Sequence, residues 1–190
     1  MGRPPDPTRR EEVLARAVAY LAEHGLSNLS LRKLAAAMGT STNTISYQFG
    51  SKEELVEAAL GRARATTLEV LQRIRTSEPK PTLSQSIERL WDWWMEDRRN
   101  LVSTRLSMEA MLASDREYPQ ERRPELLTFW IEYFADWVQG ELGCSRDHAV
   151  AHSTLLMALL SGLVVDLQST GQTARIKASL DLYLAAWARA

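Results

Sequence analysis

Hydrophobic residues recur at helical spacing along almost the whole chain. The first apolar stripe comprises Val13, Leu14, Ala17, Val18 and Leu21. The predicted helix that carries it ends at His24-Gly25, because a glycine can take the left-handed conformation that closes a helix. Short helices are predicted from Ser30 to Met38 and from about Ser41 to Tyr47, and a long one from Lys52 to Ile74. No segment alternates convincingly with the period of two that a strand requires. The pattern therefore predicts an all-α protein.

The sequence Glu78-Pro-Lys-Pro is the clearest break in this pattern, because two prolines cannot continue a helix. Amphipathic segments resume after it. They predict five further helices, at about 83–97, 100–114, 123–142, 146–169 and 173–188. The chain thus divides into a small N-terminal helical head and a larger helical body.

The segment from Leu29 to Phe49 has the pattern of a helix-turn-helix. A tight turn containing Gly39 leads to a helix that is too short and polar to form a core by itself, since only Ile45 and Phe49 need burial. The side chains that can then face outward are Thr42, Asn43, Thr44, Ser46, Tyr47 and Gln48. Hydroxyls and amides on such a helix can reach base edges in a major groove. An ordinary helical hairpin with solvated polar caps fits the same pattern.

A family resemblance bears on this choice. Residues 31–55 read LRKLAAAMGTSTNTISYQFGSKEEL, and the preceding helix ends in LAEHGL. Over about residues 8–60 the chain resembles the DNA-binding signature of the tetracycline-repressor (TetR) family. The resemblance implies a helix-turn-helix domain at 1–52 and a ligand-binding and dimerisation domain at 53–190. It also implies a regulator, expected to be a repressor, that binds a near-palindromic double-stranded DNA operator as a homodimer and responds to a small-molecule effector.

The resemblance implies a role for each matched position. Ser30 and Arg32 would contact phosphate or a groove edge, and Lys52 would hold a phosphate. The side chains that would read bases or brace on the backbone are Thr42, Asn43, Thr44 and Tyr47. The chain departs from the family pattern at Ser46, where an aromatic residue is usual, and at Asn43, where a small residue is common. Because an asparagine amide can pair with N6 and N7 of adenine, Asn43 is a candidate adenine reader.

Charge favours the N-terminus as the nucleic-acid end only weakly. The chain carries a formal net charge of −1, so any positive surface must be local. Residues up to Arg64 have a net charge of +2 and the remainder a net charge of −3. Arg3, Arg9 and Arg10 precede the predicted first helix, either as a basic arm for the minor groove or as a solvated tail.

Large apolar side chains concentrate in the body, since all six tryptophans and four of the five internal methionines follow the proline break. This stripe is either core or the wall of a pocket for a small hydrophobic or aromatic effector. The candidate lining residues are Trp91, Trp94, Met95, Met108, Met111, Trp130, Phe134 and Met157. Arg105 and Glu109, four residues apart, form either a surface ion pair or a site where Arg105 fixes a polar group of the ligand.

Residues 154–167 are apolar nearly all round the predicted helix, so both of its sides must be covered. Together with the last helix it can form a four-helix bundle between two subunits, which is the usual TetR-family dimer. The small residues Ser161 and Gly162 would allow the helices to cross closely. The candidate interface residues are Leu156, Leu160, Gly162, Leu163, Leu167, Leu180, Tyr183 and Trp187, and the sequence leaves open which stripe faces the partner.

Other functional classes find little support. The single cysteine, Cys144, excludes an intramolecular disulfide and a cysteine-based zinc cluster, and His148 and His152 lack a third metal ligand. No phosphate-binding glycine loop or nucleophile-elbow motif is present. The N-terminus has no apolar signal segment, and polar residues interrupt the apolar run 155–167. We therefore expect a cytoplasmic protein with no membrane span, no enzymatic activity, no cofactor and no metal.

Overall fold

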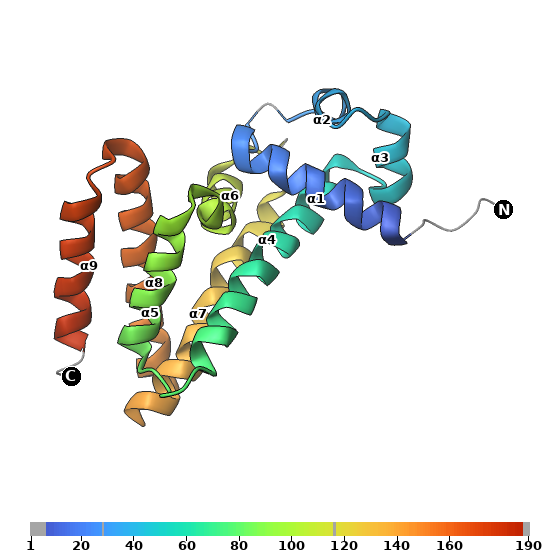
Figure 1. Ribbon diagram of the computed structural model, residues 1–190. Coiled ribbons are helices and arrows are strands. Elements are labelled where there is room, and N and C mark those ends of the chain that lie inside the picture. Colours follow the sequence, from blue (N-terminus) through green and yellow to red (C-terminus); the bar gives the residue numbers. More distant parts are fainter. Residues whose placement is uncertain (1–6, 28, 116, 188–190) are drawn as a thin grey trace. The chain divides into compact units, whose positions relative to one another are not determined.

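A computed structural model describes residues 7–27, 29–115 and 117–187, and every regular element in these ranges is a helix (Figure 1). The predicted all-α class is confirmed. The elements are α1 (Pro7–His24), α2 (Leu31–Ala37), α3 (Thr42–Phe49), α4 (Lys52–Arg75), α5 (Leu83–Glu96), α6 (Val102–Leu112), α7 (Arg123–Leu142), α8 (Arg146–Thr170) and α9 (Thr173–Trp187), with short 3₁₀ turns at Arg98–Leu101 and Gln120–Arg122.

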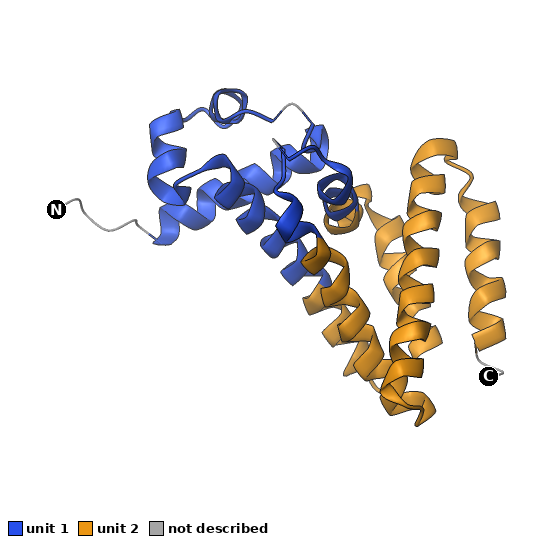
Figure 2. Ribbon diagram, turned by 180° about the vertical axis from the view of Figure 1, so that it is seen from behind, with its two compact units in different colours: residues 1–67, 105–123 blue, residues 68–104, 124–190 orange. Residues whose placement is uncertain are grey.

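The chain forms two compact units, coloured separately in Figure 2. Unit 1 comprises residues up to Thr67 together with Arg105–Arg123, and unit 2 comprises Leu68–Thr104 and the residues from Pro124 onward. Helices α4 and α6 each contribute residues to both units. These boundaries follow packing, whereas the division predicted at residue 52 concerns function and stays a prediction.

The core of unit 1 follows the apolar stripes of the sequence. The fully buried side chains Leu21, Leu34 and Ile45 come from α1, α2 and α3. The predicted position of two arginines is corrected, because α1 already begins at Pro7. Arg9 pairs with Glu12 at 3.3 Å and the Arg10 guanidinium lies 4.6 Å from the centre of the Phe49 ring, so neither belongs to an extended arm. Arg3 lies outside the described residues.

The C-terminal end of α1 is held by two side chains of α6. Arg105 Nη2 donates to the carbonyl oxygens of Leu21, at 2.7 Å, and Ala22. Glu109 Oε2 accepts the backbone N–H of Leu26 at 2.6 Å, and its Oε1 lies 3.3 Å from Arg105 Nε. Because a helix end leaves carbonyls without partners, this arrangement, which we term the α1–α6 clasp, satisfies groups that water would otherwise cover.

Unit 2 is built around α5, α8 and α9. Thr82 and Gln85 form a reciprocal capping box that starts α5, which explains why this helix begins directly after the prolines. Helix α9 packs against both α5 and α8, burying Ile176 and Leu180 completely. The carboxylate of Glu141, near the end of α7, accepts the backbone N–H of Leu83 at 2.6 Å and so ties the start of α5 to α7.

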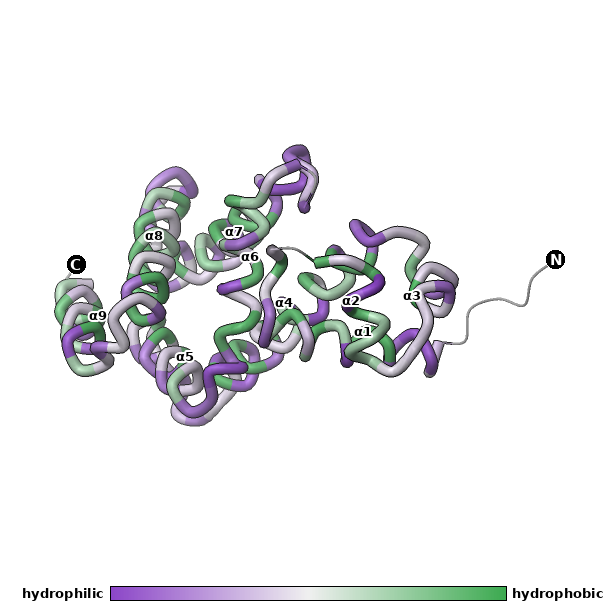
Figure 3. Tube along the Cα trace, turned by 90° about the horizontal axis from the view of Figure 1, so that it is seen from above, coloured by the Kyte–Doolittle hydropathy of each residue, from purple (hydrophilic) through white to green (hydrophobic). Residues whose placement is uncertain are grey.

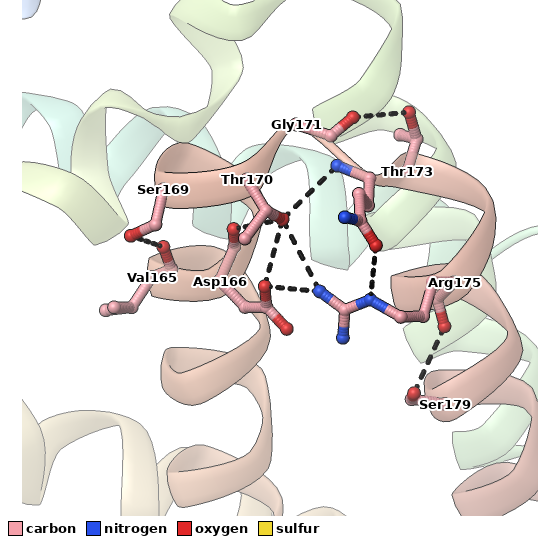
Figure 4. A network of polar contacts seen from close by, with 9 residues as sticks. Val165, Asp166, Ser169, Thr170, Gly171, Thr173, Arg175 and Ser179 are labelled. Carbon is pink, nitrogen blue, oxygen red and sulfur yellow. Dashed lines mark hydrogen bonds and ion pairs between the residues drawn. The ribbon is translucent and has the colours of Figure 1, made fainter.

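The turn between α8 and α9 is fixed by a polar network (Figure 4). Arg175 Nη2 donates to Asp166 Oδ1 at 2.6 Å, and Arg175 Nε donates to Gln172 Oε1 at 2.8 Å. Thr170 Oγ1 donates to both the carbonyl and the carboxylate of Asp166. The hydrogen bond from Arg175 lowers the pKa of Asp166, with Thr170 contributing in the same direction. The network sets the register in which α9 returns along α8.

The clasp predicts a difference between two glycines of unit 1. Gly25 and Gly39 both have positive φ, at 72° and 61°, so an alanine strains either backbone by about 1 kcal/mol. A Cβ at Gly25 would also lie 2.6 Å from Glu109 Oε2, whereas a Cβ at Gly39 meets nothing within 4 Å. In urea denaturation, Gly25→Ala should therefore lower the free energy of unfolding by about 1–2 kcal/mol more than Gly39→Ala.

The same pair of substitutions in a Glu109→Ala background provides the control. There the carboxylate is absent, so the two glycine substitutions should cost nearly the same. Equal costs in the wild-type background would instead mean that Glu109 moves aside freely and that the clasp contributes nothing to stability.

Candidate nucleic-acid interface and effector sites

The recognition helix α3 is positioned by its apolar side. Ile45 is fully buried and Phe49 is 4% exposed, so they anchor α3 in the core of unit 1. Ser41 caps the helix, since its hydroxyl accepts the backbone N–H of Thr44 at 3.1 Å and lies 2.9 Å from the Thr44 hydroxyl. The first turn of α3 is therefore well defined, and its remaining N–H groups can receive an anion.

The outward face of α3 largely matches the prediction. Thr42, Asn43 and Ser46 are exposed, and Tyr47 is 52% exposed. Thr44, which bonds to the capping Ser41, is half-buried. The prediction is wrong for Gln48, which is only 9% exposed and whose Oε1 has no hydrogen-bond donor among the described residues. Gln48 lies one residue before Phe49, on the side of the helix that turns inward.

The first turns of α2 and α4 precede and follow α3 in the sequence. Ser30 caps α2 by accepting the backbone N–H of Lys33 at 3.2 Å, and Arg32 on the first turn is exposed. Lys52 is the first residue of α4 and lies 4.0 Å from the carboxylate of Glu53. A cation is electrostatically unfavourable at a helix N-terminus, and the carboxylate of Glu53 offsets part of the charge of Lys52 there.

The predicted effector residues differ widely in exposure and position. Trp91, Trp94 and Phe134 are buried, and the two tryptophan rings meet edge to face at 6.0 Å. Trp130 is half-buried and stacks on Phe134 at 6.2 Å. The half-buried methionines divide between the units, with Met108 and Met111 in unit 1 and Met95 and Met157 in unit 2.

Arg105 and Trp94, both predicted to contact the effector, differ in their hydrogen bonds. The ligand role predicted for Arg105 is corrected, because its guanidinium is engaged with backbone carbonyls of α1 in the clasp. The alternative prediction, a surface ion pair between Arg105 and Glu109, describes only part of the contacts, because Arg105 also donates to the backbone of α1. By contrast, the indole Nε1 of Trp94 is buried and has no acceptor among the described residues.

A cavity that the sequence did not indicate lies within unit 2, between the C-terminal half of α4 and α7. We term it the α4–α7 cavity. Its volume is about 640 Å³, and its lining residues are Leu68, Gln72, Arg75, Thr76, Lys80, Phe129 and Tyr133. The basic last turn of α4 and the aromatic residues at i and i+4 on α7 are visible in the sequence. Only the pairing of the two helices shows that they share one site.

The structure also corrects most of the predicted dimer interface. Within a single chain, Leu156, Leu160 and Leu180 are at most 3% exposed. Leu163, Leu167 and Trp187 are buried as well, with His152 packing edge to face on Trp187 at 5.0 Å. These residues line the protomer's own core, where α9 packs against α8. Of the predicted set, only Gly162 is exposed and Tyr183 half-buried.

A different stripe of α8 and α9 remains uncovered, and both helices carry hydrophobic residues along their length (Figure 3). Leu155, Val165 and Leu182 are 62%, 54% and 73% exposed. Small residues lie on the same faces of α8 and α9 as these exposed side chains, with the spacing of a heptad repeat. The full stripe, which we term the α8–α9 face, is Ala151, Leu155, Ala158, Gly162 and Val165 on α8 and Ala178, Leu182 and Ala185 on α9.

Comparisons with known proteins agree with this arrangement. Residues 13–59 match the family model described as bacterial regulatory proteins, tetR family. The chain is 30% identical over 186 residues to the HTH-type transcriptional repressor AcnR of Corynebacterium diphtheriae, covering 92% of this chain and 88% of that protein. It is 26% identical to the HTH-type transcriptional repressor BepR of Brucella suis, covering 82% of this chain and 78% of that protein.

Solved structures show the same fold. The multidrug binding protein EbrR in complex with imidazole superposes with a TM-score of 0.66 at 25% identity, covering 96% of this chain and 91% of that one. A TetR transcriptional regulator from Legionella pneumophila superposes with a TM-score of 0.69 at 18% identity, covering 97% of both chains. The chain therefore belongs to the tetR family of bacterial regulatory proteins and is a helix-turn-helix transcription regulator rather than an enzyme.

Proposed function

We propose that the protein is a cytoplasmic repressor that binds a near-palindromic operator as a homodimer and responds to a small-molecule effector. The observation that carries the DNA-reading assignment is the polar, exposed leading face of α3. Thr42 and Asn43 have no role in the core of unit 1, and Ile45 and Phe49 hold the helix that presents them. The repressor assignment is supported by the two relatives named as repressors.

The contacts to DNA divide into two kinds. Thr42, Asn43 and Ser46 are short, exposed polar side chains suited to base edges, and Asn43 can pair with adenine. Tyr47, Arg32 and Lys52 supply phosphate contacts, together with Ser30, which caps α2, and Thr44, which lies in the first turn of α3. Two such heads must be roughly 34–36 Å apart to enter successive major grooves.

The properties of the α8–α9 face favour a second copy of this chain as the partner that covers it. By length and composition α8 is apolar enough to cross a membrane, yet only 28% of its most apolar window is buried within the chain. Such a surface needs a cover in water. Its alanines and Gly162 allow two helices to approach closely, and two helices from each subunit complete a four-helix bundle.

The effector assignment concerns the helical domain proposed for residues 53–190. Among the predicted lining residues of unit 2, Trp94 offers a buried indole N–H, without an acceptor in the described residues, for a polar contact. The half-buried Met95, Trp130 and Met157 offer apolar contacts to a ligand. The solved relative EbrR, which carries imidazole, supports a small molecule as the effector class.

Base reading by Asn43 is tested by selection from a randomised duplex library. The wild type should select a near-palindromic consensus. Asn43→Ala should lose the preference at one position in each half-site, at a cost of about 1–3 kcal/mol there. An identical consensus for the two proteins would remove Asn43 from the base-reading set, and failure of the wild type to select any consensus would overturn the proposed function.

Phosphate contact by Lys52 is tested through salt dependence. Lys52→Ala should weaken binding to all sequences alike and reduce the slope of log affinity against log salt by about one ion per head. Arg73→Ala, which removes the same charge from an exposed site in unit 2, should leave that slope unchanged. Equal slopes for wild type and Lys52→Ala would show that this lysine does not contact DNA.

The dimer face is tested with two glycines that are matched in the monomer. Gly162 in α8 and Gly140 in α7 are both helical and exposed, and a Cβ at either meets nothing within 4 Å. Gly162→Arg should give folded monomers, because it places an unpaired cation in the interface, and should weaken operator binding on the order of 100-fold. Gly140→Arg should remain dimeric in light scattering.

A dimer that persists in Gly162→Arg would contradict this placement of the interface. A wild type that is monomeric in water and instead floats with phospholipid vesicles would assign the α8–α9 face to lipid. Circular dichroism distinguishes loss of the dimer from loss of the fold.

A further inference from the structure

The α4–α7 cavity combines two cations with an aromatic wall. Its volume of about 640 Å³ lies within the range of small-molecule sites, which is roughly 300–1,000 Å³. Arg75 and Lys80 are its only charged lining residues. Across the ranges that the structure describes, neither residue forms an ion pair. The cavity therefore has a one-sided positive charge.

The two acidic residues of α7 that lie nearest to Tyr133 in sequence do not compensate this charge. Glu132 and Asp136 are both bound by Arg146, at the start of α8. They are acceptors already committed to another cation, and neither lines the cavity. An incoming anion would thus meet Arg75 and Lys80 without competition from a lining carboxylate.

Arg75 is also held in place by aromatic rings. Its guanidinium lies 5.2 Å from the centre of the Trp137 ring, and Trp137 is 5% exposed. Burial raises the pKa of Tyr133, while the positive charge of Arg75 and a hydrogen bond with it act in the opposite direction. A guanidinium that rests on a fixed indole loses less side-chain freedom when it binds an anion.

An ordinary structural role does not account for this arrangement. Arginines in the last turn of a helix favour the negative end of its dipole, and Arg73 and Arg75 share that role equally in α4. Only Arg75 also lines a cavity and packs on a tryptophan. Arg73, which is exposed, lies two residues away and does not line the cavity, is therefore a matched control for the effect of removing a positive charge.

We propose that the α4–α7 cavity binds a small aromatic anion, a carboxylate or sulfonate on a ring system. The acidic group lies between Arg75 and Lys80, with the amide of Gln72 as a further donor, and the rings lie against Leu68, Phe129 and Tyr133. Such a pairing of a guanidinium with an oxyanion is strong because its hydrogen bonds are charge-assisted. This site is distinct from the interior residues Trp91 and Trp94.

Occupancy of the cavity has a direct route to the DNA-reading unit. The lining residues Leu68, Gln72 and Arg75 lie on α4, which ends at Arg75 and whose N-terminal residue is the proposed phosphate contact Lys52. The helix is continuous from Lys52 to Arg75 and belongs to both units. A ligand that favours one packing of α4 on α7 therefore shifts the position of that helix, and this regulatory consequence rests on the proposed function.

The site is tested with two fluorescent probes that share their rings and differ in one group. Anilinonaphthalene sulfonate carries the anion, and N-phenyl-naphthylamine lacks it. The full-length wild type should bind the sulfonate more tightly than the neutral amine. In the double variant Arg75→Gln/Lys80→Gln the affinity for the sulfonate should fall about tenfold, while that for the amine stays the same. Arg73→Gln should change neither.

An unaltered sulfonate affinity in the double variant would overturn the site, as would an equal loss with Arg73→Gln. A second measurement separates binding from regulation. Titration of the sulfonate into a complex of the protein with its selected operator should release DNA from the wild type and not from the double variant. Binding that depends on Arg75 without DNA release would retain the site and refute its role as an effector site.

Discussion

The α1–α6 clasp is the contact on which the organisation of unit 1 depends. Arg105 and Glu109 satisfy backbone groups at the end of α1 that lie more than eighty residues earlier in the chain. Gly25 makes this approach possible, because any side chain there would meet the Glu109 carboxylate. Residues 105–123 consequently pack with the DNA-reading helices, although sequence order alone would place them in the body.

A second link in the same unit has similar chemistry. Tyr118 is 1% exposed, and its hydroxyl donates to Glu57 Oε2 at 2.7 Å, while Arg122 lies 3.6 Å from the same carboxylate. The segment after α6 is thus bound to α4 as α6 itself is bound to α1. Polar contacts of this kind have strict geometry, so the helices they join cannot slide independently.

In unit 2, residues of the same type on one helix have different roles, depending on whether another helix covers the face on which they lie. On α8, Leu156 and Val164 pack inside the protomer, while their neighbours Leu155 and Val165 are exposed. On α4, Arg73 is a helix-end cation and Arg75 belongs to a cavity. In each case a rotation of about 100–200° around a helix, one or two residues, separates a structural side chain from one available to a partner.

The sequence by itself determined the order of the helices, most of their ends and most of the outward face of α3. Periodicity, capping serines and glycines act over a few residues, so Ser41, Gly25 and the stripe from Val13 to Leu21 were readable without tertiary information. Tertiary structure alone decided three things: the burial of Gln48, the engagement of Arg105 with α1 and the face of α8 left uncovered. Each depends on which distant helix packs against a residue, and an apolar pattern that runs round a helix cannot specify that choice.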